Sequence, residues 1–338
     1  MSAVRIGVIG VGRIGAMHAR LLAAQVPGAE VVAVNDARPE AARMLGDELR
    51  VPVTGSAEEL MAHPDVEAVA ICSSTETHAP LIAAAAEAGK AIFCEKPVSH
   101  DLVEVDGALE AVRQAGVPFQ IGFNRRFDPA HQSVRDAVAS GRIGEPHLVR
   151  ITSRDPYPPP TSYVRASGGI FLDMTIHDFD MARYVTGSEV AEVYARGAVR
   201  IDPSFADAGD VDTALVVLVH ESGCITSIDN SRQTSYGYDQ RVEAFGPGGM
   251  AASENPLRHT GIARTAEGTA APVLPDFFLD RYIPSYIREW EAFVGAVSAG
   301  EETPVGLVDA RAPLVIGLAA GRSLHEGRPV RVGEVVAA

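Results

Sequence analysis

The sequence is poor in cysteine, short of basic residues and without long apolar runs, and each shortage excludes a class of protein. Three cysteines (Cys72, Cys94 and Cys224) are too few and too scattered for a disulfide framework or a zinc knuckle. Lys and Arg number 29 against 44 Asp and Glu, and a net charge of −15 disfavours binding to nucleic-acid phosphates. No apolar segment reaches the roughly 18 residues of a membrane span, and the first residues lack the basic start of a signal peptide. We therefore expect a cytoplasmic protein that binds neither membranes nor nucleic acids.

The chain has 338 residues, of which 46% are hydrophobic, enough for two domains. Up to residue 122, short β-branched runs alternate with alanine-rich helical stretches, which is typical of βαβ units around a parallel sheet. Residues 1–122 are therefore predicted to form a Rossmann dinucleotide-binding domain. The expected strands are 4–9, 31–35, 66–72, 91–94 and 118–122, and the expected helices are 15–25, 39–49, 57–61, 80–88 and 101–115.

The pattern changes after residue 122. Longer runs alternate apolar and polar residues, and the connection at 221–223 is short and contains glycine, which indicates antiparallel hairpins. Residues 123–338 are predicted to form an α+β domain with a large, open, mostly antiparallel sheet, which binds the substrate and mediates oligomerisation. The expected strands are 147–153, 190–199, 212–220, 223–231 and 240–246, and the expected helices are 131–140, 169–185, 282–299 and 308–326.

A glycine-rich element follows the first predicted strand and leads directly into a helix. Its pattern is G-x-G-x-x-G, with residues Gly10, Gly12, Arg13, Ile14 and Gly15 as the predicted cofactor contacts. Glycines allow close backbone approach to a phosphate, and the helix N-terminus supplies free N–H groups. The context of strand, loop and helix predicts a dinucleotide site.

An acid at the end of the second strand bears on the choice of dinucleotide. Asp36 can accept hydrogen bonds from the ribose diol and repels a 2′-phosphate, which favours NAD over NADP. Arg38 weakens this preference, because an arginine there can pair with a 2′-phosphate. In the alternative interpretation Asp36 only caps the next helix.

Polar residues follow two further strands, where ligands of open parallel sheets bind. The first group follows the strand ending at Cys72, and the second is Glu95 with Lys96 before Pro97. In the alternative interpretation Glu95 and Lys96 form a solvated charge pair. The first group contains Ser73, Ser74, Thr75 and His78.

A third pattern, G-G-x-x-x-D-x-x-x-H-x-x-D, begins at Gly168. Asp173 and His177 are four residues apart, so a continuous helix would place them on one face. A carboxylate can fix the tautomer of a histidine base and stabilise its charged form. An aspartate near a helix start is also a common cap. With Asp180 the set lacks a second His or Cys, so we predict no metal.

In combination, these motifs resemble those of the Gfo/Idh/MocA oxidoreductases. The resemblance implies that Lys96 lies near the nicotinamide, that Asp173 and His177 join it as catalytic residues, and that Lys96 also contacts cofactor and substrate. Residues 121–128, 144–146 and 236–241 are similar to the inositol 2-dehydrogenase branch. This implies substrate contacts at Asn124, Arg154, Asp155 and Tyr236, and a homotetramer, with a dimer as the alternative. The stretch Tyr-Pro-Pro-Pro at 157–160 departs from the branch.

The expected function is therefore NAD-dependent oxidation of one secondary hydroxyl of a cyclic polyol, myo-inositol or a close relative, to a ketone. One alternative is the same chemistry on another sugar, an aldose or an anhydrosugar. A second is NAD-assisted glycoside hydrolysis, in which transient oxidation permits elimination. A third, a non-catalytic dinucleotide sensor, is disfavoured by the joint presence of Lys96, Asp173 and His177.

Overall fold

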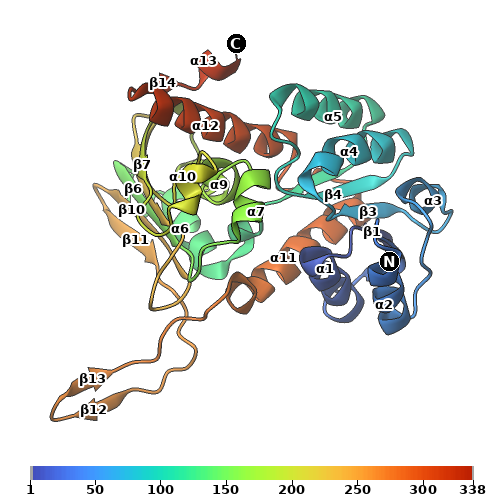
Figure 1. Cartoon of the computed structure of the whole chain (residues 1–338), viewed down its shortest axis with the longest axis horizontal. Helices are drawn as coiled ribbons and strands as arrows, with labels where there is room; N and C mark the ends of the chain where they lie inside the picture. The colour runs from blue at the N-terminus through green and yellow to red at the C-terminus, as the bar shows by residue number, and fades with distance from the viewer. Residues whose placement is uncertain (1–2, 337–338) are drawn as a thin grey trace. The chain divides into compact units, whose positions relative to one another are not determined.

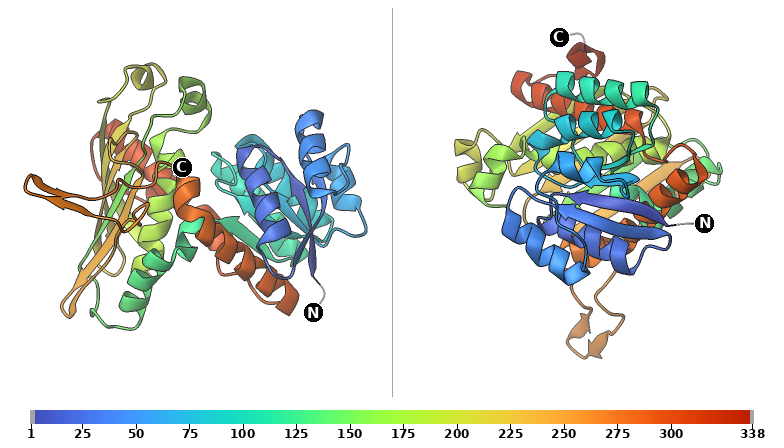
Figure 2. Two further views of the ribbon diagram at one scale, coloured as in Figure 1. Left: turned by 90° about the horizontal axis from the view of Figure 1, so that it is seen from below. Right: turned by 90° about the vertical axis from the view of Figure 1, so that its right-hand side faces the viewer.

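A computed structural model describes residues 3–336 (Figures 1 and 2). The chain divides into two compact units. The first comprises the chain up to Asn124 together with Ser285–Leu314, and the second comprises Arg125–Pro284 together with the chain from Val315 onward. The division at 124 lies close to the boundary expected after residue 122. Residues 285–314 fall within the predicted second domain, but they pack with the first unit.

The first unit contains a parallel sheet in the order β2-β1-β3-β4-β5. This order and the intervening helices confirm the predicted Rossmann fold. The strand β3 is buried along its whole length, as expected for a strand covered on both faces. The strands are β1 (Val4–Ile9), β2 (Ala29–Asn35), β3 (Ala68–Ile71), β4 (Ala91–Glu95) and β5 (Phe119–Gly122), and the helices are α1 (Arg13–Ala24), α2 (Pro39–Leu49), α3 (Ala57–Ala62), α4 (His78–Glu87) and α5 (Leu102–Ala115).

Residues 285–314 of the first unit include most of the long helix α11 (Phe278–Ala299). Trp290, the only tryptophan of the chain, is fully buried in the core of this unit. Its ring lies 4.1 Å, centroid to centroid, from that of Phe93 in β4, and Phe293 packs beside both. Burying an aromatic side chain stabilises a fold by about 1.5–3 kcal/mol, which explains why α11 packs on this sheet.

The second unit is built on a sheet in the order β11-β10-β6-β9-β8-β7-β14. Every neighbouring pair is antiparallel except β6 and β9, which confirms a mostly antiparallel sheet. The strands are β6 (Leu148–Arg154), β7 (Val190–Ala198), β8 (Thr213–His220), β9 (Ile225–Ser231), β10 (Asp239–Gly246), β11 (Gly249–Ser253) and β14 (Val330–Arg331).

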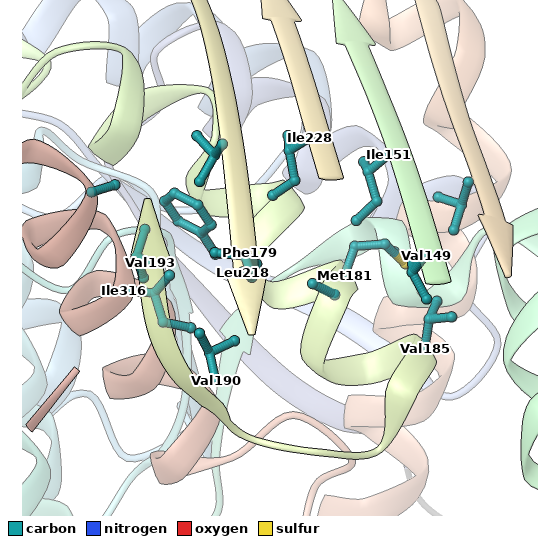
Figure 3. Packing of buried hydrophobic residues seen from close by; sticks show 14 of the residues in the cluster. Val149, Ile151, Phe179, Met181, Val185, Val190, Val193, Leu218, Ile228 and Ile316 are labelled. Carbon is teal, nitrogen blue, oxygen red and sulfur yellow. The ribbon is translucent and has the colours of Figure 1, made fainter. Parts of the chain in front are cut away.

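Helices cover one face of this sheet and leave the other open (Figure 2). On the covered face, Val149 and Ile151 of β6 pack with Phe179 and Met181 from the helical layer (Figure 3). Apolar side chains also lie on the open face, among them Leu148, Leu215, Ile225 and Phe245. The helices are α6 (Pro129–Ala139), α7 (Thr161–Ala166), α8 (Ile170–Asp173), α9 (Ile176–Thr186), α10 (Ser204–Asp207), α12 (Leu307–Glu326), which begins in the first unit, and α13 (Gly333–Val336).

A small hairpin, β12 (Ala263–Thr265) with β13 (Gly268–Ala270), extends away from the sheet of the second unit (Figure 1). All residues of the two strands are exposed. Within residues 3–336, the helices are too short or too polar to cross a membrane.

The helix expected over 169–185 is interrupted between α8 and α9, which corrects that prediction. The N–H of Thr175 donates to the carbonyl of Ile170 (2.9 Å), one residue further back than in an α-helix. The Thr175 hydroxyl donates to Oδ1 of Asn230 in β9 (2.7 Å). This bond to a distant strand fixes the distorted turn, so Asp173 and His177 lie on either side of it.

Candidate functional site

Three adjacent strands of the first unit end at one edge of the sheet. Strand β1 pairs with β3, and β3 pairs with β4, all in parallel, with Ile9 opposite Ile71 and Ile71 opposite Cys94. The residues that follow these strands are therefore neighbours: the glycine loop, the Ser73–Ser74 segment and Lys96. This edge is where parallel α/β sheets bind ligands.

The glycine loop forms a cradle that side chains would fill. Gly10 has φ +84°, and a Cβ there would lie 2.4 Å from the backbone nitrogen of Ser73. A Cβ at Gly15 would lie 1.8 Å from the carbonyl oxygen of Gly10. At Gly12, in contrast, the nearest atom would be 3.9 Å away. The helix α1 then begins with neither a side-chain cap nor an acidic residue in its first turn, which suits a phosphate.

Asp36 ties the end of β2 to this cradle. Its Oδ2 accepts the N–H of Val11 (2.7 Å), and its Oδ1 accepts the N–H of Arg38 (2.8 Å). Nε of Arg38 also lies 3.3 Å from Oδ1. The carboxylate thus borders the loop, as a ribose-binding acid requires. It does not cap α2, because Arg38 is the N-cap residue and no side chain of the described residues caps this helix. The cradle and Asp36 fit NAD.

His78 links the loops that follow β3 and β4. Its Nδ1 lies 2.7 Å from the carbonyl oxygen of Pro97, and its Nε2 lies 3.0 Å from that of Ser73. Burial lowers the pKa of His78, which opposes the doubly protonated ring that donation to both carbonyl oxygens would need. The hydroxyls of Ser73 and Thr77 are 2.6 Å apart. His78 therefore lies between the Ser73 and Lys96 loops, and its neutral ring donates a hydrogen bond to one of the two carbonyl oxygens.

Glu95 is held inside the first unit by a chain of hydrogen bonds from Trp290 through His18, here called the relay, which the sequence did not predict. The Nε1–H of Trp290 donates to Nδ1 of His18 (2.8 Å). Because indole nitrogen only donates, Nε2 of the neutral His18 carries the proton and donates to Oε1 of Glu95 (2.8 Å). The other oxygen of Glu95 accepts the N–H of Lys96 (3.2 Å). His18 is fully buried.

Asp173 and His177 stand out from their surroundings in the second unit. They are the two residues between Ile170 and Arg183 that are not buried. Oδ2 of Asp173 accepts from Nη1 of Arg232 (2.7 Å), and Oδ1 accepts from the hydroxyl of Tyr163 (2.8 Å). Sequence reasoning identified neither partner: Arg232 is 59 residues away, and Tyr163, 10 residues away, belongs to a separate short helix.

A buried polar network supports this helical segment. The carboxylate of Asp178 accepts from Arg125 (2.8 Å), Ser153 (2.5 Å) and Nδ2 of Asn230 (2.7 Å). Burial raises the pKa of Asp178, and these donors oppose the shift. These residues are structural partners that we did not predict.

Asp180, the last acid of the helical motif, accepts hydrogen bonds from Nε and Nη2 of Arg126 (2.9 and 2.6 Å). Across the described part of the chain, no three His, Cys, Asp or Glu side chains are grouped as metal ligands. The three cysteines are free and buried. Asp180 therefore acts as the counterion of an arginine.

The predicted substrate contacts have different surroundings. Asn124 is buried, and its Nδ2 has no hydrogen-bond partner within residues 3–336. Asp155 is half-buried, and its surroundings raise the pKa of its carboxyl to about 6, chiefly by desolvation. Arg154 instead bonds to Asp229 (2.8 Å) and to the hydroxyl of Tyr236 (2.9 Å).

Arg154 and Tyr236 belong to the open face of the sheet. Along β6, Val149, Ile151 and Ser153 are buried, and Arg154 has the opposite parity. The Tyr236 hydroxyl also donates to Asp239 (2.8 Å). Their positions within this unit therefore give no support to a contact with a substrate bound beside His177.

A glycine cradle beside an acidic strand end is how many oxidoreductases bind a dinucleotide, and the first unit is such a domain. Residues 4–123 match the family model "Oxidoreductase family, NAD-binding Rossmann fold", and residues 131–252 match the "GFO/IDH/MocA C-terminal domain". The chain belongs to the Gfo/Idh/MocA oxidoreductase family. It is an NAD-dependent dehydrogenase, which confirms the family and the cofactor expected from the sequence.

Individual relatives match over almost their whole length. The myo-inositol 2-dehydrogenase of Thermotoga maritima is 47% identical over 98% of this chain and 99% of its own. The inositol 2-dehydrogenase of Rhizobium meliloti is 45% identical over 97% and 99%. The structure of scyllo-inositol dehydrogenase from Lactobacillus casei, with NAD(H) and scyllo-inositol bound, is similar with a TM-score of 0.92 and 29% identity, covering 98% of this chain and 100% of that one.

Proposed function

We propose that this enzyme oxidises one secondary hydroxyl of a cyclic polyol, myo-inositol or a close relative, to the ketone. The observation that carries the proposal is the single sheet edge shared by the glycine cradle, the Ser73 loop and Lys96. An ammonium group delivered to the edge where NAD binds suits a reaction that develops negative charge on oxygen. The full-length similarity to inositol dehydrogenases supports the substrate class.

The cofactor supplies the redox chemistry, since NAD accepts a hydride from the carbon that bears the hydroxyl. Residues 10–15, Asp36 and Ser73–Thr75 would hold it, with Arg38, His78 and Glu95 as supporting residues. We assign three roles to this chain's own side chains. His177 accepts the hydroxyl proton, Asp173 orients His177 and stabilises its charged form, and Lys96 stabilises the developing alkoxide.

Substrate recognition requires further polar groups. The buried Nδ2 of Asn124 lacks a protein acceptor within residues 3–336, and a polyol oxygen would satisfy it. Asp155 lies close enough to Asp173 and Arg232 to interact with both electrostatically. We propose Asn124 and Asp155 as substrate contacts, while a contact from Arg154 or Tyr236 stays a prediction from the sequence.

A substrate panel tests the proposal. The purified enzyme is incubated with NAD and, separately, myo-inositol, scyllo-inositol, an aldose, an anhydrosugar and an aryl glycoside, and NADH absorbance is recorded. We expect the highest kcat/KM with an inositol. A higher kcat/KM with the aldose or the anhydrosugar would show that the substrate is a sugar of that class and not an inositol. Cleavage of the aryl glycoside without net formation of NADH would show that the enzyme is an NAD-assisted glycoside hydrolase.

We also propose that the enzyme is a cytoplasmic homotetramer in which the open sheet faces pack together. Buried free cysteines suit a reducing compartment. Leu215, Phe245 and Met250 are 54%, 46% and 56% exposed on the open face, and such apolar surface favours cover by a second copy. Light scattering that detects only a 35.6 kDa species at micromolar concentration would refute the tetramer and the alternative dimer.

A further inference from the structure

We propose that Arg232 is a positioning residue that holds the Asp173 carboxylate in one orientation and keeps it ionised for its work with His177. This inference rests on the proposed function for its chemical meaning. Nη1 of Arg232 donates to Oδ2 of Asp173 (2.7 Å), while the Tyr163 hydroxyl donates to Oδ1 (2.8 Å). Each oxygen of the carboxylate is therefore held by a separate donor.

The local sequence explains how two distant residues reach Asp173. Arg232 directly follows β9, and its N–H donates to the carbonyl oxygen of Asp212 (2.9 Å), which fixes the backbone. Tyr163 lies in α7, which begins immediately after the proline-rich stretch 157–160. Consecutive prolines restrict the backbone before this short helix. The stretch that departs from the inositol dehydrogenase branch thus leads directly to one of the two donors.

The burial of Arg232 argues against a role in stability alone. Its side chain is 2% exposed, whereas the Asp173 side chain is 12% exposed. Nε and Nη2 of Arg232 have no hydrogen-bond partner within residues 3–336. A buried donor without a partner is unfavourable, and buried ion pairs are often no more stable than apolar replacements. A guanidinium retained here at that cost is best explained by what it does to Asp173.

Several acids surround the guanidinium, and the direct bond goes to Asp173. Burial alone would favour the neutral form of Arg232, but its pKa is raised by Asp173 first and then by Asp155 and Asp210. Asp210 is itself engaged, because its Oδ1 accepts the N–H of Ile170 (3.0 Å) at the start of α8. Asp155 has a pKa of about 6 and also interacts with Arg125 and Asp178.

The pairing separates the roles of the two proposed catalytic side chains. A carboxylate bonded to a guanidinium is a weak proton acceptor. The substrate proton therefore goes to His177, and Asp173 remains an anion that stabilises the protonated ring. Removing the charge of Arg232 raises the proton affinity of both Asp173 and His177, because a nearby positive charge disfavours protonation.

The test compares Arg232→Met and Arg232→Gln with the unmodified enzyme and with Arg322→Met. Arg322 is the matched control, since its side chain is 38% exposed and pairs with Glu326 one turn along α12. Histidine is labelled with ¹³C at Cε1, the His177 signal is identified by its loss in His177→Asn, and its titration is followed by NMR without substrate. We expect the pKa of His177 to rise by roughly one unit in both Arg232 variants, to fall in Asp173→Asn and to stay unchanged in the control.

Kinetics with NAD and the best inositol complete the test. We expect kcat to fall by about 10- to 100-fold in the Arg232 variants, the acidic limb of kcat/KM to move to higher pH and the Kd for NAD to stay unchanged. An unshifted His177 titration in whichever neutral variant folds overturns the proposal. If neither folds, Tyr163→Phe provides the same test from the other oxygen of Asp173. A shifted titration in an enzyme that oxidises no polyol leaves the pairing in place and refutes the proposed function instead.

Discussion

The two units build their parts of the proposed site in different ways. In the first unit the decisive contacts are made by backbone: a glycine with φ +84°, an uncapped helix start and an N–H that meets Asp36. In the second unit the decisive contacts join charged side chains that lie far apart in the chain, such as Arg232 and Asp173, 59 residues apart. The cofactor side therefore depends on shape and the chemical side depends on charge, so the two should respond differently to substitution.

The largest expected effect comes from the groups assigned to chemistry. Lys96→Ala and His177→Ala should lower kcat by roughly 10²–10⁴-fold, the usual scale for a positioned acid or base. Both variants should fold and keep their affinity for NAD, which thermal unfolding and a binding titration measure. Near-normal turnover in either variant would remove that residue from the mechanism. If NAD affinity fell as much as kcat, these residues would bind the cofactor, and the division between binding and chemistry would be wrong.

The glycine cradle offers a matched pair of substitutions. Gly10→Ala places a methyl group 2.4 Å from backbone at φ +84°, so it should lower the free energy of unfolding by about 1–3 kcal/mol and weaken NAD binding. At Gly12 the methyl group meets nothing closer than 3.9 Å, so Gly12→Ala should weaken NAD binding with unfolding unchanged. Denaturant titrations with and without NAD distinguish the two. Equal losses of stability in the two variants would show that the space around Gly10 and Gly12 does not determine the effect of an added methyl group.

A smaller effect is expected from Asp36. Its removal takes away the acceptor for the ribose diol and the charge that repels a 2′-phosphate, so Asp36→Ala should reduce the preference for NAD over NADP by about tenfold. Paired binding titrations with both dinucleotides measure this ratio. If the unmodified enzyme binds NADP as tightly as NAD, the assignment of Asp36 fails.

The smallest effect should come from the relay behind Lys96. Trp290→Phe keeps an aromatic ring against Phe93 but removes the donor to Nδ1 of His18, and a lost buried hydrogen bond costs about 1 kcal/mol. We expect a slightly lower midpoint of urea unfolding and little change in kcat. A large loss of kcat would show that the hydrogen bonds from Trp290 through His18 to Glu95 position Lys96 for the chemistry.

The sequence predicts what depends on neighbours in the chain and fails where a distant contact decides. The parallel sheet and its glycine loop follow from local periodicity and from spacing within one βαβ unit. The interruption between α8 and α9 could not be predicted, because it depends on a bond between Thr175 and Asn230, 55 residues away. Arg232, the partner of Asp173 from 59 residues away, was missed for the same reason, since an arginine after a strand carries no local signal of its target.

The late return of the chain to the first unit has a consequence for how this protein is made. The parallel sheet is complete once β5 has been synthesised, yet the aromatic cover from α11 is encoded by residues after 284. At a synthesis rate of about 5–20 residues per second, roughly 8–35 seconds separate the two. During that interval the nascent dinucleotide domain exposes the Phe93 side of its sheet, and the ribosome must translate nearly all of the second unit before Trp290 can cover it.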